Sequence, residues 1–262
     1  MRAVSRPNLF RPLFLALTAS AWIALWIWDT SPYSRYLHHV DWPDIPLADA
    51  LCRMMPGGPV ALAALLHAGA WLLMITAMML PTTVQLLEVF RRLTAHRADR
   101  GVLLTLVLLG YVGAWTVFGV GAHGLDAALH QLASRSLWMV MHGWLVGAAM
   151  LGLAGVYQFS RFKYRCLDKC RTPLMFVAEH WHGHNERRDS FLLGVRHGAF
   201  CVGCCWALML LMFALGTGSI GWMLALGAAM AVEKNLPWGR RIGKPLGLAL
   251  VAWSGVMVAQ HL

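Results

Sequence analysis

Runs of apolar residues alternate with short polar segments along almost the whole chain. Seven apolar segments can be marked, and most of them approach the length of about 20 residues at which a helix spans a bilayer. They cover residues 13–28, 60–80, 102–122, 137–159, 198–216, 218–233 and 245–260. The pattern predicts an all-α fold, a polytopic transmembrane helix bundle of about seven helices. The first, sixth and seventh segments are the shortest.

Composition agrees with this pattern, because 58% of the 262 residues are hydrophobic and only 13% are charged. Soluble domains carry roughly twice that share of charge. No soluble domain, repeat or low-complexity tract interrupts the chain. We therefore expect a single integral membrane domain over residues 1–262, in contact with the lipid bilayer, with an outside loop at 29–59 and an inside loop at 160–197.

The basic residues predict how the helices cross the membrane. All but three of the 22 lysines and arginines fall on one side of the alternating segments, and the exceptions are Arg35, Arg53 and Arg135. The positive-inside rule places the N-terminus inside and the C-terminus outside. Membrane insertion thus explains the net charge of +10, and we expect no nucleic-acid partner. The first apolar run ends in WIALWIWD, without a small-x-small cleavage site, which favours a retained first helix.

Three cysteines stand close together in the fifth segment, in the sequence RHGAFCVGCCWALMLLMFALG. Cys201, Cys204 and Cys205 have the spacing i, i+3 and i+4, so they share one face of a helix. His197 lies one turn earlier on that face, and Met212 lies further along the same stripe. Cysteine and methionine also serve as ordinary core residues. Three thiols on one face with a histidine behind them nevertheless favour a metal or redox role.

Two other segments are predicted to end at the same level of the membrane. The second segment ends with Met78 and Met79, just before Pro81, which can kink a helix and free a backbone carbonyl. The sixth segment ends with Glu233, a candidate ligand or proton acceptor. The alternatives are that the methionines only pack and that Glu233, in the EK before NLPWGRR, is only an interfacial anchor.

The chemistry of these side chains favours a soft metal ion. Thiolate and thioether ligands prefer Cu(I), which accepts two or three sulfurs, whereas zinc competes when histidine takes part and takes four ligands. We therefore expect copper as Cu(I), with zinc as the alternative. Most of the cysteines lie on the inner side, where thiols stay reduced, so structural disulfides are not expected.

Cys166 and Cys170 form a second pair, at i and i+4 around LDK in the inside loop. This spacing aligns the two thiols on an extension of the fourth helix or closes them over a metal shared with the cluster. The histidines of HWHGH follow. They are either further ligand candidates or, equally, part of a solvated turn at the headgroups.

Four sequence stretches, in this order, resemble a bacterial family of predicted metal-binding integral membrane proteins, a family of unknown function sometimes labelled copper chaperones. The stretches are MITAMMLPT, YQFSRFKYRCLDKCRTPLMF, HGAFCVGCCWALMLLMF and MAVEK. The likeness runs from about residue 65 to 235 and implies a multi-pass protein of the bacterial inner membrane that binds metal. The matching residues are Met78, Met79, Pro81, Cys166, Cys170, His197, Cys201, Cys204, Cys205 and Glu233. The family pattern supports no ligand role for the HWHGH histidines.

Three functions are consistent with these features. The first is copper handling or cuproprotein assembly, in which the cysteine cluster holds Cu(I) and passes it to a metal acceptor or membrane protein partner. The second is a non-catalytic subunit or assembly factor of a larger membrane complex. The third is a thiol redox enzyme or transporter, because Cys201 and Cys204 form C-x-x-C at an expected helix start. The chain has no Rossmann, P-loop, HExxH or nucleophile-elbow motif, so an enzyme is not favoured.

Overall fold

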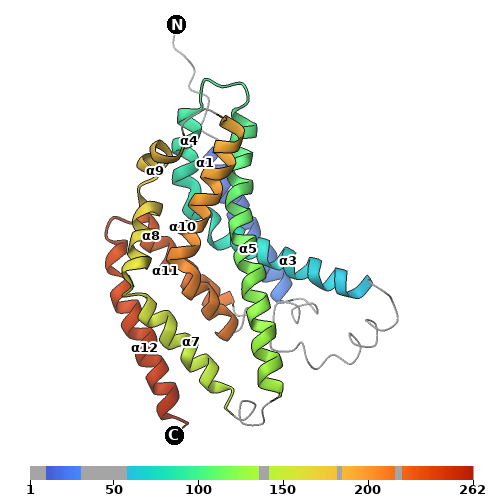
Figure 1. Ribbon diagram of the computed structural model, residues 1–262, viewed down its shortest axis with the longest axis vertical. Helices are drawn as coiled ribbons and strands as arrows, with labels where there is room; N and C mark the ends of the chain where they lie inside the picture. Colours follow the sequence, from blue (N-terminus) through green and yellow to red (C-terminus); the bar gives the residue numbers. More distant parts are fainter. Residues whose placement is uncertain (1–9, 31–57, 136–141, 182–184, 216–219, 262) are drawn as a thin grey trace.

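The computed structural model describes residues 10–30, 58–135, 142–181, 185–215 and 220–261, and every element in these ranges is a helix (Figure 1). The all-α prediction is confirmed there. The α-helices are α1 Phe10–Asp29, α3 Gly58–Met78, α4 Val84–Leu93, α5 Arg100–Ser134, α7 Trp144–Tyr157, α8 Arg161–Arg171, α9 Pro173–His180, α10 Glu186–Leu215, α11 Ile220–Asn235 and α12 Gly243–Ala259. Two short 3-10 turns, η3 Leu80–Thr83 and η4 Gly239–Arg241, complete these ranges.

Each of the seven apolar segments contributes to a helix in these ranges, but their lengths differ. Four helices are long and apolar enough to cross a membrane: Phe10–Asp29, Arg100–Leu125, Glu186–Met212 and Gly239–Ala259. The pair Ala68–Met78 and Leu80–Leu93 is a fifth span if it is counted as one, and Trp144–Tyr157 is apolar but shorter. The number of seven crossings and their sidedness remain predictions.

The segment predicted to be an inside loop, 160–197, is largely helical where the structure describes it, and its position inside the membrane boundary remains a prediction. It contains α8, α9 and the first turns of α10. Ser160 caps α8 by accepting a hydrogen bond from the backbone N–H of Phe162, and α9 begins at Pro173, a residue favoured in the first turn. Because α10 already begins at Glu186, Cys201 lies about four turns inside the helix and not at its start.

Two long helices, α5 and α10, lie side by side along the molecule (Figure 1). Glycines make this approach possible. A Cβ atom on Gly194 would lie 2.0 Å from the Val107 carbonyl oxygen, and one on Gly110 would lie 2.2 Å from that of Phe191. Gly198 continues the contact one turn further along α10. Small residues spaced by four let the two backbones touch, a spacing that is also common in membrane helix pairs.

The helices α7 and α12 form a second close pair (Figure 1), where Gly155 and Gly247 face each other's backbone. Between the two pairs, α8 packs on α10, and α11 contacts α3, α8 and α10. The largest buried cluster lies where these elements meet, and it contains five cysteines and much of the methionine. The fold therefore brings sulfur side chains from separate segments into one core.

Replacing Gly194 by alanine is expected to destabilise the protein by about 1–3 kcal/mol, because the added methyl group meets the backbone of α5. The measurement is the midpoint of thermal unfolding of purified protein in detergent. Gly113→Ala is the matched control on α5, since nothing lies within 4 Å of its Cβ position. The control should be neutral or slightly stabilising, and equal midpoints for the two variants would contradict the close approach.

Candidate metal centre

Sulfur atoms from four helices and one helix junction meet in the largest buried cluster. The residues are Cys201, Cys204 and Cys205 on α10, Cys166 and Cys170 on α8, Met78 at the end of α3 and Met79 just after it, and Met230 on α11. All of these side chains are buried, and the five cysteines are free thiols. The sequence placed these residues at one level, and the structure brings them together.

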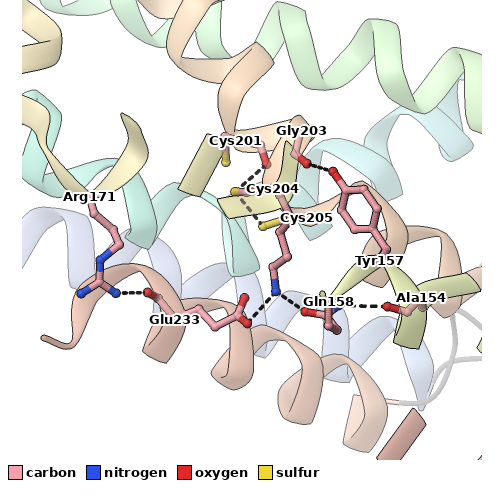
Figure 2. Close-up of polar contacts among 10 residues, drawn as sticks. Ala154, Tyr157, Gln158, Arg171, Cys201, Gly203, Cys204, Cys205 and Glu233 are labelled. Carbon is pink, nitrogen blue, oxygen red and sulfur yellow. Dashed lines mark hydrogen bonds and ion pairs between the residues drawn. The ribbon is translucent and has the colours of Figure 1, made fainter. Parts of the chain in front are cut away.

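Short polar contacts link the three α10 cysteines (Figure 2). The Cys204 thiol donates a hydrogen bond to the Cys201 carbonyl oxygen at 3.1 Å, and its Sγ lies 3.4 Å from the Cys205 Sγ. Cys170 on α8 lies within hydrogen-bonding reach of both Cys201 and Cys204. A thiol of α8 thus faces the α10 cluster, as the i, i+4 spacing of its two cysteines allows.

The remaining cysteine of α8, Cys166, packs directly on the backbone of α10. A Cβ atom at Gly203 would lie 2.7 Å from its Sγ, so only glycine leaves room for the thiol. The Tyr157 hydroxyl donates to the Gly203 carbonyl oxygen and fixes the same turn (Figure 2). Burial raises the pKa of the Cys166 thiol, and Cys205 adds to the effect. Cys166 is therefore held as a neutral thiol beside the cluster.

The chain bends beside Met79, as the following proline predicted. The two helical segments around it, Ala68–Met78 and Leu80–Leu93, meet at 49°. The bend leaves the Met79 carbonyl oxygen outside a regular helix, where it accepts hydrogen bonds from the Thr82 hydroxyl at 2.7 Å and from the Tyr111 hydroxyl at 3.1 Å. The hydrogen bond from Tyr111 therefore fixes the backbone of Met79 against α5.

A buried lysine lies directly on the cluster. The Lys234 Nζ is 2.8 Å from the Cys201 Sγ, 3.4 Å from the Thr82 hydroxyl and 3.9 Å from the Met79 Sδ. The Tyr111 hydroxyl lies 3.1 Å from the same Cys201 sulfur. Treating the residues after the sixth segment as interfacial anchors missed this lysine. Its spacing was the available signal, because Lys234 follows Met230 by four residues and so shares its helix face.

The neighbouring Glu233 is also buried, but it points to a different partner. Its carboxylate forms an ion pair with Lys163 of α8 at 2.6 Å, and the same ammonium group donates to Gln158 (Figure 2). Arg171 donates to the Glu233 carbonyl oxygen and so caps the end of α11. The carboxylate already has a cationic partner, and its role as a metal ligand remains a prediction.

His197 lies one turn before Cys201, with its ring between those of Phe176 and Tyr111. It is buried, and its Nδ1 finds no hydrogen-bond partner among the residues that the structure describes. Such an imidazole nitrogen is free to accept a ligand. Of the HWHGH histidines, His180 stacks on Phe176, whereas His182 and His184 lie outside the described residues.

The described residues contain no group of three or more His, Cys, Asp or Glu side chains in the arrangement that holds a metal ion. The thiols instead meet in pairs, next to thioethers and the Lys234 ammonium group. All nine predicted ligands are buried at or beside the cluster. Their roles as metal ligands remain predictions.

Comparison with known proteins identifies the family. The model of a family described as copper chaperone, PpoB2, matches residues 68–257, which is more than half of the chain. The chain therefore belongs to this family, and the resemblance noted in the sequence is confirmed. Searches among curated proteins and among solved structures give no match. The matched range includes every one of the nine predicted ligands.

Replacing Lys163 by leucine leaves the buried Glu233 carboxylate without its ion-pair partner, and we expect a loss of about 3–5 kcal/mol in the free energy of unfolding. The double replacement Lys163→Leu, Glu233→Leu removes both charges and should recover most of this loss. The measurement is chemical denaturation in detergent micelles. If the double variant is as unstable as Lys163→Leu alone, loss of this ion pair is not the cause of the destabilisation.

Proposed function

We propose that this member of the copper chaperone family carries Cu(I) as cargo on the thiols of α10 and delivers it to a copper acceptor or an unfinished cuproprotein. The observation that carries the proposal is the meeting of free, buried thiols from α8 and α10 with the thioether of Met79. Family membership supports copper handling in general. The choice of ligands and of the Cu(I) state rests on the donor atoms.

The donor set suits a soft monovalent ion. Cu(I) is satisfied by two or three sulfur ligands and accepts thioethers, whereas zinc sites are usually closed by four Cys or His ligands. Cys201 and Cys204 or Cys205 are the primary ligands in this proposal, with Cys170, Met79 and the free nitrogen of His197 next to them. Cys166, Met78 and Glu233 line the surroundings. Burial keeps water and oxidants away from the thiols.

The membrane setting is part of the proposal. The chain forms one membrane domain that crosses the bacterial inner membrane seven times, with its N-terminus inside. Five helical spans or bent pairs of the required length and apolarity support multiple crossings. The excess of basic residues on one side supports the orientation. The acceptor of the copper is a membrane protein partner or a protein that docks at the membrane.

The redox alternative loses its main argument in the structure. It required C-x-x-C at a helix start, where the helix dipole promotes thiolate formation. Cys201 and Cys204 instead lie well inside α10. In the remaining alternative, a subunit of a larger complex, the cysteines only pack, and replacing them by serine would leave function intact.

The triple variant Cys201→Ser, Cys204→Ser, Cys205→Ser tests the proposal. Purified wild-type protein, loaded anaerobically with Cu(I) and desalted, should retain close to one copper per chain, and the triple variant should retain almost none. The physical reason is that serine hydroxyls are hard ligands that bind Cu(I) poorly. Elemental analysis by mass spectrometry gives the metal content, and size-exclusion chromatography shows that the variant remains folded.

Two outcomes would overturn the proposal. One is full copper retention by a folded triple variant, and the other is purification of the wild type with zinc alone and no capacity for Cu(I). Gly113→Ala controls for losses of copper during purification and loading. Nothing lies within 4 Å of its added Cβ atom, so this variant should have the wild-type copper content.

A separate test concerns the thioether of Met79. Met79→Leu keeps the volume but removes the sulfur, and we expect the affinity for Cu(I) to fall by about tenfold, or 1.4 kcal/mol. Competition with a chromophoric Cu(I) chelator gives the affinity. Met175→Leu is the matched control, because Met175 is exposed on α9 and should have no effect. Equal affinities for the two variants would exclude Met79 as a ligand.

A further inference from the structure

The contact between Lys234 and Cys201 has a direction that follows from hydrogen-bond chemistry. An ammonium group has three N–H donors and no acceptor. Around the Lys234 Nζ the structure places three acceptors, namely the Cys201 Sγ, the Thr82 hydroxyl and the Met79 Sδ. These three acceptors match the three N–H donors of an ammonium group, so we assign Lys234 its charged form, with one donor directed at the Cys201 sulfur.

Among the described residues, no carboxylate balances the charge of Lys234, because the ion pair at this level joins Glu233 to Lys163. Lys234 lies in the last turn of α11, where the helix dipole favours a cation, and its shortest polar contact is with the sulfur of Cys201. The cysteine cluster thus carries a permanent positive charge that is only a few ångströms from any metal bound to Cys201.

We propose that Lys234 determines the charge specificity of the copper site, by admitting a monovalent cation and rejecting divalent ones such as Zn(II). This inference rests on the proposed function, since it concerns the same thiols. Lys234 helps every metal equally by stabilising the Cys201 thiolate, because each metal uses that ligand. It repels the bound ion in proportion to the ion's charge, so the repulsion of a divalent ion is twice that of a monovalent one.

The ratio of the Cu(I) affinity to the Zn(II) affinity separates the repulsion of the bound ion from the stabilisation of the thiolate. Replacing Lys234 by a neutral residue changes thiolate stability for Cu(I) and Zn(II) alike, so that effect cancels from the ratio of the two affinities. The loss of repulsion does not cancel, because it favours the divalent ion twice as strongly. At a separation of a few ångströms and an effective dielectric constant near 20, the ratio of Cu(I) to Zn(II) affinity should fall by about tenfold or more.

The experiment measures both affinities on purified protein in detergent, with chromophoric chelators as competitors for Cu(I) under anaerobic conditions and for Zn(II). The variants are Lys234→Leu and Lys234→Gln, two neutral residues that add no sulfur ligand. Lys234→Arg keeps the charge and should keep the ratio close to the wild-type value. Lys169→Leu is the control for a lysine whose partner, Glu179, is exposed, and it should leave the ratio unchanged.

The expected result is a fall in the affinity ratio of about tenfold or more in both neutral variants and not in Lys234→Arg or Lys169→Leu. An unchanged ratio in folded Lys234→Gln and Lys234→Leu overturns the inference, and Lys234 is then only a structural partner of Cys201. That outcome leaves the proposed function standing if the triple serine variant loses copper. If the triple variant retains copper, the proposed function itself fails.

Discussion

Two consecutive charged residues at the end of α11 need opposite partners inside a helix bundle, and the arrangement of the core follows from that need. A buried charge without a partner costs several kcal/mol, so each must find its counterpart in the low-dielectric interior. Glu233 finds it in Lys163 of α8, whereas Lys234 donates hydrogen bonds to Cys201 of α10 and to Thr82 in the 3-10 turn after α3. The end of α11 thereby joins α8, α10 and the α3–α4 bend around the thiols.

The bend beside Met79 also requires that buried polar groups find hydrogen-bond partners. Pro81 has no N–H with which to continue the hydrogen-bond ladder of α3, and in the 3-10 turn the Met79 carbonyl oxygen accepts from the hydroxyl groups of Tyr111 and Thr82. These two residues are also the ones that contact Cys201 and Lys234. The irregular backbone is therefore not isolated from the cysteine cluster, because one set of hydroxyl groups serves both.

Much of this arrangement could be predicted from the sequence, because helical periodicity alone places Cys201, Cys204 and Cys205 on one face and Pro81 alone predicts a kink. The charged residues were harder. The segment RFKYRCLDKCR resembles a solvated loop by composition, yet Lys163, Cys166, Leu167 and Cys170 are spaced i, i+3, i+4 and i+7 and form the buried face of α8. A cation next to a membrane span is normally assigned to the headgroups, and for this reason the sequence did not predict that Lys163 and Lys234 are buried.

The distinction between a buried and an exposed lysine determines whether one charge can select a metal. At the protein surface, water and salt screen an ammonium group within about a Debye length, and a divalent ion gains or loses little from its presence. Lys234 is 5% exposed and lies among apolar side chains, so the screening is weak and the difference between one and two positive charges persists. The thiols alone would accept either Cu(I) or Zn(II). In the proposed site, the added ammonium group makes metal binding depend on ionic charge as well as on softness.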